Sequence, residues 1–306
     1  MSTPSAIDVS HLTKSYGSLK AVKDLSFQVK AGSVFAFLGT NGAGKSTTIN
    51  CITTLLDYDE GDIMVNGRSV GKDNEKMRRE IGVVFQSSLL DPLLTVKENI
   101  QIRAGLYGLS PAEVTSRIAE LSESIGLTAF INQQYGRLSG GQRRRADIAR
   151  SLVHQPSILF LDEPTTGLDP QSRKQVWDTV RTLRGSHGLT VFLTTHYMAE
   201  TEEADNVLII DAGVAVAQGT PSELRAKYSQ NMLTITTASV GKLRAVCESL
   251  HLPCLLAHDT ATIVVASSAQ AQEILRLHGD DVRDFEFRHG TMDDVFLALT
   301  QKRTEP

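Results

Sequence analysis

The chain has 306 residues, of which 41% are hydrophobic and 22% are charged. This composition is typical of a globular protein and argues against a disordered or fibrous chain. The 31 basic and 35 acidic residues leave a net charge of −4, so charge gives no reason to expect nucleic-acid binding. No apolar run approaches the roughly 18–20 residues of a membrane span, and the opening MSTPSAIDVS lacks the pattern of a secretory signal. These features predict a cytoplasmic protein.

The cysteines fit the same compartment. Cys51, Cys247 and Cys254 are too few and too scattered for a disulfide framework or a zinc cluster. We interpret Cys247 as a buried thiol and Cys254 as a chance neighbour, because a metal pair would need two further ligands.

Short apolar segments recur through the first 220 residues. They are residues 33–38 (SVFAFL), 158–161 (ILFL), 190–193 (TVFL) and 207–210 (VLII). Near-continuous apolar strands of this kind are buried on both faces, as in a parallel sheet covered by helices. The predicted fold class of this part is therefore α/β.

A helical pattern interrupts the α/β pattern. Thr95 with Glu98, and Ser110 with Glu113, have the spacing of capping boxes at helix starts. We predict a helical subdomain, at about residues 91–155, inserted into the α/β core.

Beyond residue 220 the α/β pattern stops. Strand-like segments (233–237, 262–266, 282–287) alternate with helical patterns (240–250, 269–277, 292–299). We therefore predict two domains, residues 1–220 and a small α+β domain at 221–306. The last helical pattern has an apolar face, which either packs on its own domain or serves in assembly: Met292, Val295, Phe296 and Leu299.

A glycine-rich loop follows the first apolar segment. Residues 39–46, GTNGAGKS, match G-x-x-x-x-G-K-[ST] and precede helix-forming residues. Glycines let backbone amides curl around phosphate oxygens, and the helix N-terminus adds partial positive charge. Lys45 is expected to reach the β- and γ-phosphates, and the Ser46 hydroxyl to bind Mg²⁺.

Two adjacent carboxylates, Asp162 and Glu163, follow the ILFL segment. Ligands of an open parallel sheet lie at the carboxyl ends of its strands, where a magnesium-holding aspartate is expected. Glu163, one residue on, could polarise the attacking water as general base. With the glycine-rich loop, the pair predicts a catalytic phosphate site.

Residues 138–142, LSGGQ, are the most specific feature of the chain, and Ser139 and Gln142 have capping-box spacing. Two glycines in a first helical turn expose backbone amides, which predicts a second anion site. One nucleotide could be held between the two phosphate-binding helix starts, each from a different subunit. The helix continues with three basic residues that we interpret as a solvated face: Arg143, Arg144 and Arg145.

With these motifs the chain resembles the nucleotide-binding subunits of ABC transporters, over about residues 7–220. LSGGQ is the signature sequence of that family. Further matches follow in the family's order: the adenine-stacking aromatic Tyr16 in LTKSYG, the Q-loop glutamine Gln86 after IGVVF, the D-loop aspartate Asp169 in GLD, and the switch histidine His196 after TVFLTT. The resemblance implies an ABC-type P-loop NTPase core with an inserted helical subdomain and a small C-terminal α+β domain.

The resemblance implies a head-to-tail dimer that holds ATP between its subunits. The implied nucleotide-binding residues are Tyr16, Gly39, Thr40, Asn41, Gly42, Ala43, Gly44, Lys45, Ser46 and Thr47. The implied catalytic residues are Lys45, Gln86, Glu163 and His196, and the implied Mg²⁺ ligands are Ser46, Gln86 and Asp162. The second subunit would supply Ser139, Gly140, Gly141 and Gln142, and Asp169 would link the two sites.

The resemblance also implies a function. The chain would hydrolyse ATP as a homodimer, or as a heterodimer with a similar ATPase, and drive export through a separate integral-membrane permease, without nucleic acid. Residues 290–299, GTMDDVFLAL, are similar to the tail of the ABC-2 type exporter ATPases, particularly the daunorubicin-resistance group, which implies a drug-like or other small substrate. The alternatives are a non-transport ABC ATPase and an importer ATPase with a regulatory C-terminal domain. The implied location is the inner face of the cell membrane, through the permease.

Overall fold

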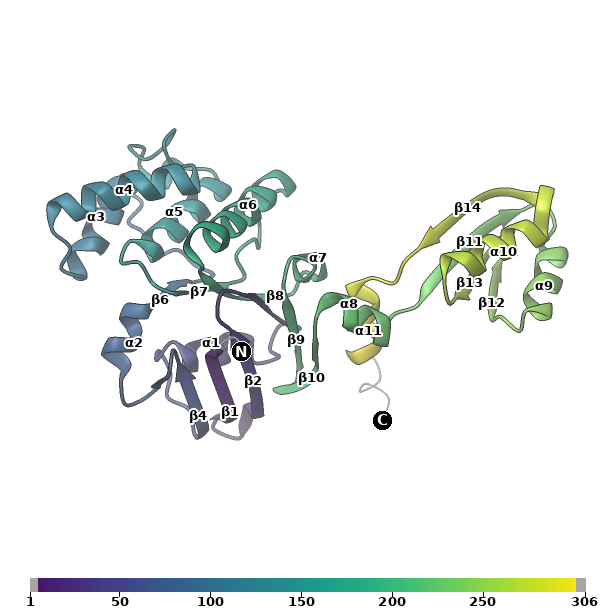
Figure 1. Ribbon diagram of the computed structural model, residues 1–306, viewed down its shortest axis with the longest axis horizontal. Helices are drawn as coiled ribbons and strands as arrows, with labels where there is room; N and C mark the ends of the chain where they lie inside the picture. The colour runs from purple at the N-terminus through teal and green to yellow at the C-terminus, as the bar shows by residue number, and fades with distance from the viewer. Residues whose placement is uncertain (1–4, 301–306) are drawn as a thin grey trace. The chain divides into compact units, whose positions relative to one another are not determined.

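The computed structural model describes residues 5–300, apart from the side chains of residues 186 and 187 (Figure 1). The first four residues of MSTPSAIDVS therefore lie outside the described part. The chain divides into two compact units, Met1–Gln218 and Gly219–Pro306. Among the described residues, no helix combines the length and apolarity that crossing a membrane requires.

A six-stranded sheet forms the centre of the first unit, in the order β10-β9-β3-β8-β7-β6. Its strands are β3 (Val34–Leu38), β6 (Ile81–Val84), β7 (Ile158–Asp162), β8 (Thr190–Thr195), β9 (Asn206–Asp211) and β10 (Val214–Gly219). The neighbours from β9 to β6 pair in parallel. Each predicted apolar segment is one of these strands, and β3 is buried along its whole length. The α/β prediction is confirmed.

The strand order places the candidate residues at one edge of this sheet. The neighbours β3, β8, β7 and β6 run in one direction, so their carboxyl ends meet. The glycine-rich loop follows β3, His196 follows β8, Glu163 follows β7, and Gln86 lies just beyond β6. Residues that are far apart in sequence thus lie together, as expected for a ligand site of an open parallel sheet.

A second sheet in this unit is antiparallel, which the sequence analysis did not predict. Its order is β2-β1-β4-β5, with β1 (Ser5–Tyr16), β2 (Leu19–Lys30), β4 (Glu60–Val65) and β5 (Arg68–Ser69). Phe27 of β2 packs on the parallel sheet, with ring centroids 5.5 Å from Phe35 and 6.0 Å from Phe192. Burying each such ring stabilises the fold by about 1.5–3 kcal/mol. One core therefore joins both sheets.

The helices of the first unit are α1 (Lys45–Ile52), α2 (Asn74–Glu80), α3 (Val96–Leu106), α4 (Pro111–Ile125), η1 (Tyr135–Arg137), α5 (Gly140–Leu152), α6 (Pro170–His187) and α7 (Met198–Thr201). The predicted capping boxes at Thr95, Ser110 and Ser139 are all present. Helix α5 packs against α3, α4 and α6 (Figure 1). This packing fixes the start of α5, where the LSGGQ sequence lies.

The second unit is a β-α-β-β-α-β arrangement with an added pair of helices. Its sheet is antiparallel, in the order β12-β13-β11-β14. The elements are α8 (Pro221–Tyr228), β11 (Asn231–Thr237), α9 (Val240–Ser249), β12 (Cys254–Ala257), β13 (Thr260–Val265), α10 (Ser268–His278), η2 (Gly279–Asp281), β14 (Val282–Arg288) and α11 (Met292–Thr300). Its core includes Cys247, with Cys254 packed against it. Helix α11 packs on α8 and buries Met292, Val295 and Phe296, as the core-packing alternative predicts.

Candidate nucleotide site

The glycine-rich loop joins β3 to α1 and ends at Gly44, the N-cap of α1, with a φ of 104°. A Cβ atom at this position would lie 2.5 Å from the backbone oxygen of Ala21. Both the conformation and the space therefore require glycine here. The helix that follows directs its N-terminus towards the loop, which favours a phosphate.

Lys45 is the first residue of α1, and its side chain is 5% exposed. Its ammonium donates hydrogen bonds to the backbone oxygens of Gly39 (2.8 Å) and Thr40 (3.0 Å). Burial lowers the pKa of Lys45, and the charges of Glu163 and Asp162 oppose that shift. The loop thus holds a desolvated cation ready for an anionic ligand.

Glu163 is the centre of the site. Its Oε1 lies 3.8 Å from Lys45 Nζ and 3.3 Å from His196 Nδ1. Its Oε2 accepts hydrogen bonds from Gln86 Nε2 (3.4 Å) and Thr166 Oγ1 (3.1 Å). The structure therefore brings together the four residues that were predicted to be catalytic.

The backbone of Glu163 is held in an unusual conformation, with a φ of +46°. Its amide donates to the Thr194 side-chain oxygen (3.0 Å) and backbone oxygen (3.2 Å). Left-handed backbone is uncommon for residues other than glycine and clusters at functional sites. Thr194 on the neighbouring strand β8 thus aims the Glu163 carboxylate towards Lys45.

Asp162 ends strand β7, and its Oδ1 accepts a hydrogen bond of 2.5 Å from Thr194 Oγ1. Ser46, the second residue of α1, is exposed, and Gln86 carries an amide oxygen. A hydroxyl, a carboxylate and an amide are the oxygen donors that Mg²⁺ prefers. The predicted magnesium ligands fit the ion by their chemistry.

Arg144 contradicts the interpretation of residues 143–145 as a solvated face. Arg143 is exposed, but Arg144 is 7% exposed. Its guanidinium donates to the backbone oxygens of Phe85 (2.6 Å), Asp162 (2.8 Å), Glu163 (2.9 Å) and Pro164 (2.7 Å). Burial lowers the pKa of Arg144. One side chain therefore holds the segment before Gln86 and the end of β7 together.

The LSGGQ sequence begins α5. The Ser139 hydroxyl accepts from the Gln142 amide (3.3 Å), and Gln142 Oε1 accepts from the Ser139 amide (2.9 Å). Ser139 and Gly140 are exposed, whereas Gly141 is buried. A Cβ at Gly141 would lie 2.6 Å from Ser172 Oγ, so this position requires glycine as long as residue 172 is serine.

Asp169 caps α6 next to this contact. Its Oδ1 accepts from the Ser172 amide (2.9 Å) and its Oδ2 from the Ser172 hydroxyl (2.6 Å), and these bonds lower its pKa. Within the described residues, no hydrogen bond or ion pair joins Ser139 or Asp169 to Lys45 or Glu163. Tyr16 lies at the end of β1 and is 50% exposed. These residues form separate surfaces of one chain.

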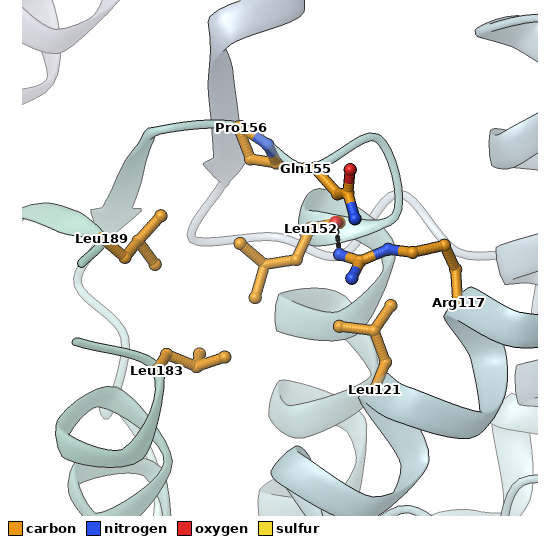
Figure 2. Close-up of a pocket in the computed structure, with 7 residues that line it drawn as sticks. All are labelled: Arg117, Leu121, Leu152, Gln155, Pro156, Leu183 and Leu189. Carbon is orange, nitrogen blue, oxygen red and sulfur yellow. Dashed lines mark hydrogen bonds between the residues drawn. The ribbon is translucent and has the colours of Figure 1, made fainter. Parts of the chain in front are cut away.

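A small pocket lies elsewhere in this unit (Figure 2). It has a volume of about 160 Å³ and is lined by Arg117, Leu121, Leu152, Gln155, Pro156, Leu183 and Leu189. Figure 2 shows the Arg117 guanidinium donating to the Leu152 backbone oxygen, at 2.8 Å. No predicted site residue lines it, so it is separate from the candidate site.

Comparison with known proteins defines the class. Residues 22–166 match the family model for ABC transporters, and residues 219–300 match that for the ATP-binding protein DrrA1-3-like, C-terminal domain. The chain is 40% identical to the daunorubicin/doxorubicin resistance ATP-binding protein DrrA of Streptomyces peucetius, over 96% of this chain and 92% of that protein. The chain belongs to the family of ABC transporter ATP-binding proteins.

Two further comparisons define the type of subunit. The chain is 35% identical to the linearmycin resistance ATP-binding protein LnrL of Bacillus subtilis, over 96% of this chain and 98% of that protein. A solved ATP-binding cassette dimer in a post-hydrolysis state, bound to ADP and Pi, covers 70% of this chain and 98% of its own, with a TM-score of 0.64 and 29% identity. The chain is the ATP-binding and ATP-hydrolysing subunit of an ABC exporter.

Two site residues were missed from sequence. Arg144 is spaced three residues after Gly141 and four before Ile148, both buried, and this helical period could have indicated its burial. Thr194 lies inside an apolar strand, where a threonine side chain gives no signal of its hydrogen bond to a carboxylate.

Proposed function

We propose that ATP binds to the loop of residues 39–47 of one subunit and is closed over by residues 139–142 of another. Two observations support this arrangement. The Ser139 and Gly140 backbone is exposed at a helix start, and among the described residues no hydrogen bond or ion pair joins it to the glycine-rich loop of its own chain. Splitting the phosphate donors between subunits makes hydrolysis depend on dimer closure. The partner is a second copy or a similar ATPase.

In this proposal Glu163 accepts the proton of the attacking water. Its carboxylate lies beside both Lys45 and His196, so the water would stand between the base and the groups that bind the γ-phosphate. Lys45 would exchange its bonds to Gly39 and Thr40 for bonds to phosphate oxygens. Tyr16 would stack on adenine. The observation that carries the proposal is that Lys45, His196 and Gln86 all lie next to the Glu163 carboxylate.

Ser46, Gln86 and Asp162 would hold Mg²⁺, whose charge offsets that of the phosphates when it is bound. Thr194 Oγ1 holds Asp162 Oδ1, which orients the carboxylate. The amide of Gln86 donates to Glu163 from Nε2 and keeps its oxygen for the ion. Asp169 would link the two composite sites of the dimer.

The partner in the membrane would be a separate permease, and the chain would lie on the cytoplasmic face of the membrane through it. Helix α3 and the segment that precedes it carry exposed apolar side chains: Leu89 (64%), Leu93 (76%), Ile102 (57%) and Leu106 (73%). An exposed apolar patch of this kind indicates a protein contact. The exported substrate would be drug-like or another small molecule, because two relatives are named for resistance to different compounds.

We further propose that residues 1–220 act as the ATPase domain and residues 221–306 as an accessory domain for assembly. From the sequence alone, a non-transport ATPase and an importer ATPase were the alternatives. The full-length similarity to resistance ATP-binding proteins disfavours both.

The test is ATP turnover and gel filtration of the purified chain with Mg²⁺ and ATP. We expect hydrolysis that rises with the square of protein concentration at low concentration, because two subunits form each site. A rate strictly proportional to concentration, from a species that stays monomeric, would contradict the shared site.

A further inference from the structure

The end of strand β1 that carries Tyr16 is held differently from the rest of that strand. Strand β1 pairs with β4 only as far as Thr13, which lies opposite Glu60. Its pairing with β2 continues to Tyr16 but shifts register on both sides of Lys14. Register shifts of this kind disrupt the hydrogen-bond ladder between two strands. The last residues of β1 therefore depend on hydrogen bonds from outside the neighbouring strands.

Asp59 supplies these hydrogen bonds. Its Oδ2 accepts from the backbone amide of Ser15 at 2.6 Å, and its Oδ1 accepts from the Lys14 ammonium at 3.0 Å. The backbone amide of Asp59 donates to the Thr13 backbone oxygen at 2.9 Å. One residue thus binds three successive residues of β1, directly before Tyr16.

Asp59 and Lys14 form an ion pair at neutral pH. The side chain of Lys14 is 14% exposed and that of Asp59 is 40% exposed. The hydrogen bonds from Lys14 and from the Ser15 amide lower the pKa of Asp59, and the bond to Asp59 raises the pKa of Lys14. The hydrogen bond from the Ser15 amide is therefore charge-assisted, and such bonds are shorter and stronger than neutral ones.

Asp59 also lies next to the helix that follows the glycine-rich loop. It belongs to the short connection between α1 and β4. Cys51, in the last turn of α1, is buried, and the charges of Lys14 and Asp59 both act on its thiol. The Asp59 carboxylate thus joins the end of β1 to α1, and this link sets where Tyr16 stands relative to the loop of residues 39–47.

We infer that Asp59 is a positioning residue for Tyr16 and sets how tightly the nucleotide base is bound. This inference rests on the proposed function, in which Tyr16 stacks on adenine. Tyr16 is 50% exposed, so the place of its ring depends on the backbone beside it. Stacking needs a defined ring separation and offset. A shift in the end of β1 would therefore weaken binding of the base and leave the phosphate contacts of the loop intact.

The test compares ATP with inorganic tripolyphosphate, which carries phosphates but no base. Asp59→Ala should raise KM for ATP by about 3–10-fold, part of the effect of losing one stacked base. Both kcat and the inhibition constant of tripolyphosphate should stay within about twofold of the wild-type values, because the phosphate contacts are unchanged. Asp59→Asn keeps an oxygen for the Ser15 amide, so its KM should lie between those of the wild type and Asp59→Ala.

Tyr16→Ala separates a positioning role from other effects of Asp59. It should raise KM for ATP by about 5–100-fold, the range for loss of one stacked base. Asp59→Ala should add nothing in this background, since the ring that Asp59 positions is absent. Asp8→Ala is the matched control and should leave KM unchanged. It removes a carboxylate from the other end of β1, where Asp8 accepts from Gln28 Nε2 at 2.8 Å.

Three results would overturn the inference. They are an unchanged KM in Asp59→Ala, additive effects of Asp59→Ala and Tyr16→Ala, and equal losses for ATP and tripolyphosphate, which would show that Asp59 acts through the glycine-rich loop. An unchanged KM in Tyr16→Ala would contradict the stacking role in the proposed function and the inference with it. Denaturant unfolding, followed by Trp177 fluorescence, shows that each variant is folded under the assay conditions.

Discussion

The Lys45 ammonium lies 3.8 Å from the Oε1 atom of Glu163, and the two side chains are 5% and 11% exposed. The Lys45 ammonium donates its hydrogen bonds to two backbone oxygens. Lys45 and Glu163 therefore attract each other electrostatically, without a direct hydrogen bond between them. A triphosphate entering this gap would add negative charge next to Glu163. A water that attacks the last phosphate from this gap would have the carboxylate beside it, which is the position a general base requires.

Glu163→Gln should preserve ATP binding and lower turnover by about 10²–10⁴-fold, the range for removal of a general base. Glutamine keeps the size of the side chain and removes the charge that opposes the phosphates. We expect a dimer with ATP in gel filtration and slow phosphate release. A monomeric elution profile with nucleotide bound would contradict the composite site.

Ser139→Phe should preserve ATP binding by the monomer and abolish turnover, because the bulky side chain would stand on the exposed surface that closes over the nucleotide. It also removes a helix cap worth about 1 kcal/mol. Ser110→Phe is the matched control, since Ser110 caps α4 with the same capping box. Normal hydrolysis by the Ser139 variant, or equal loss in both variants, would refute a specific role of this surface.

Arg144→Lys should destabilise the first unit by about 2–4 kcal/mol, because an ammonium cannot reach the carbonyl groups that the guanidinium binds. As a positioning residue, Arg144 should affect kcat more than KM for ATP, with kcat falling at least tenfold. Stability is followed by the fluorescence of Trp177, which is buried in α6. Arg145→Lys is the control, since Arg145 makes one hydrogen bond, to Gly126. Equal effects of both changes would reject the positioning role.

His154 should make the first unit sensitive to acid. Burial lowers its pKa from 6.5 to about 4, and the nearby arginines add to the shift. The unfolded chain therefore binds a proton between pH 6.5 and 4 that the folded chain does not bind. Stability should fall across this window as pH decreases, by about 3 kcal/mol in total.

The measurement is denaturant unfolding by Trp177 fluorescence at several pH values. His154→Gln can still donate to the Ile81 backbone oxygen, as the ring nitrogen does at 3.0 Å, but does not titrate. Its stability should decline less steeply below pH 6.5, whatever its value at pH 7. Parallel curves for both proteins would show that His154 is not the responsible group.

The parallel sheet and three helix starts could be predicted because their signals are local. Strands such as β3 and β7 are continuous apolar runs, and Ser139 with Gln142 form a capping box by spacing alone. The antiparallel sheet was missed although the second half of β2 alternates buried and exposed residues, a signal that the sequence carried. Strand β1 shifts register several times against β2, which breaks the alternation that identifies a strand.

The residues of the candidate site that belong to a sequence motif could be predicted. Those whose position depends on tertiary contacts were missed. The sequence around Lys45 and Glu163 indicated phosphate chemistry. Arg144 was taken for a surface residue because charge usually indicates exposure. Its burial depends on four backbone oxygens, which come from the segment around Phe85 and from residues 162–164. The sequence next to Arg144 does not indicate that these segments meet there.

Gly141 at the start of α5 packs directly against Ser172 at the start of α6. Ser172 also holds the carboxylate of Asp169, so a larger residue at position 141 would displace the cap of α6. The space between the two backbones holds only one side chain, which at present is that of Ser172. A side chain added at position 141 therefore requires that the side chain at position 172 be removed. Gly141→Ala should be tolerated only in combination with Ser172→Gly, so the two residues are expected to change as a pair or not at all.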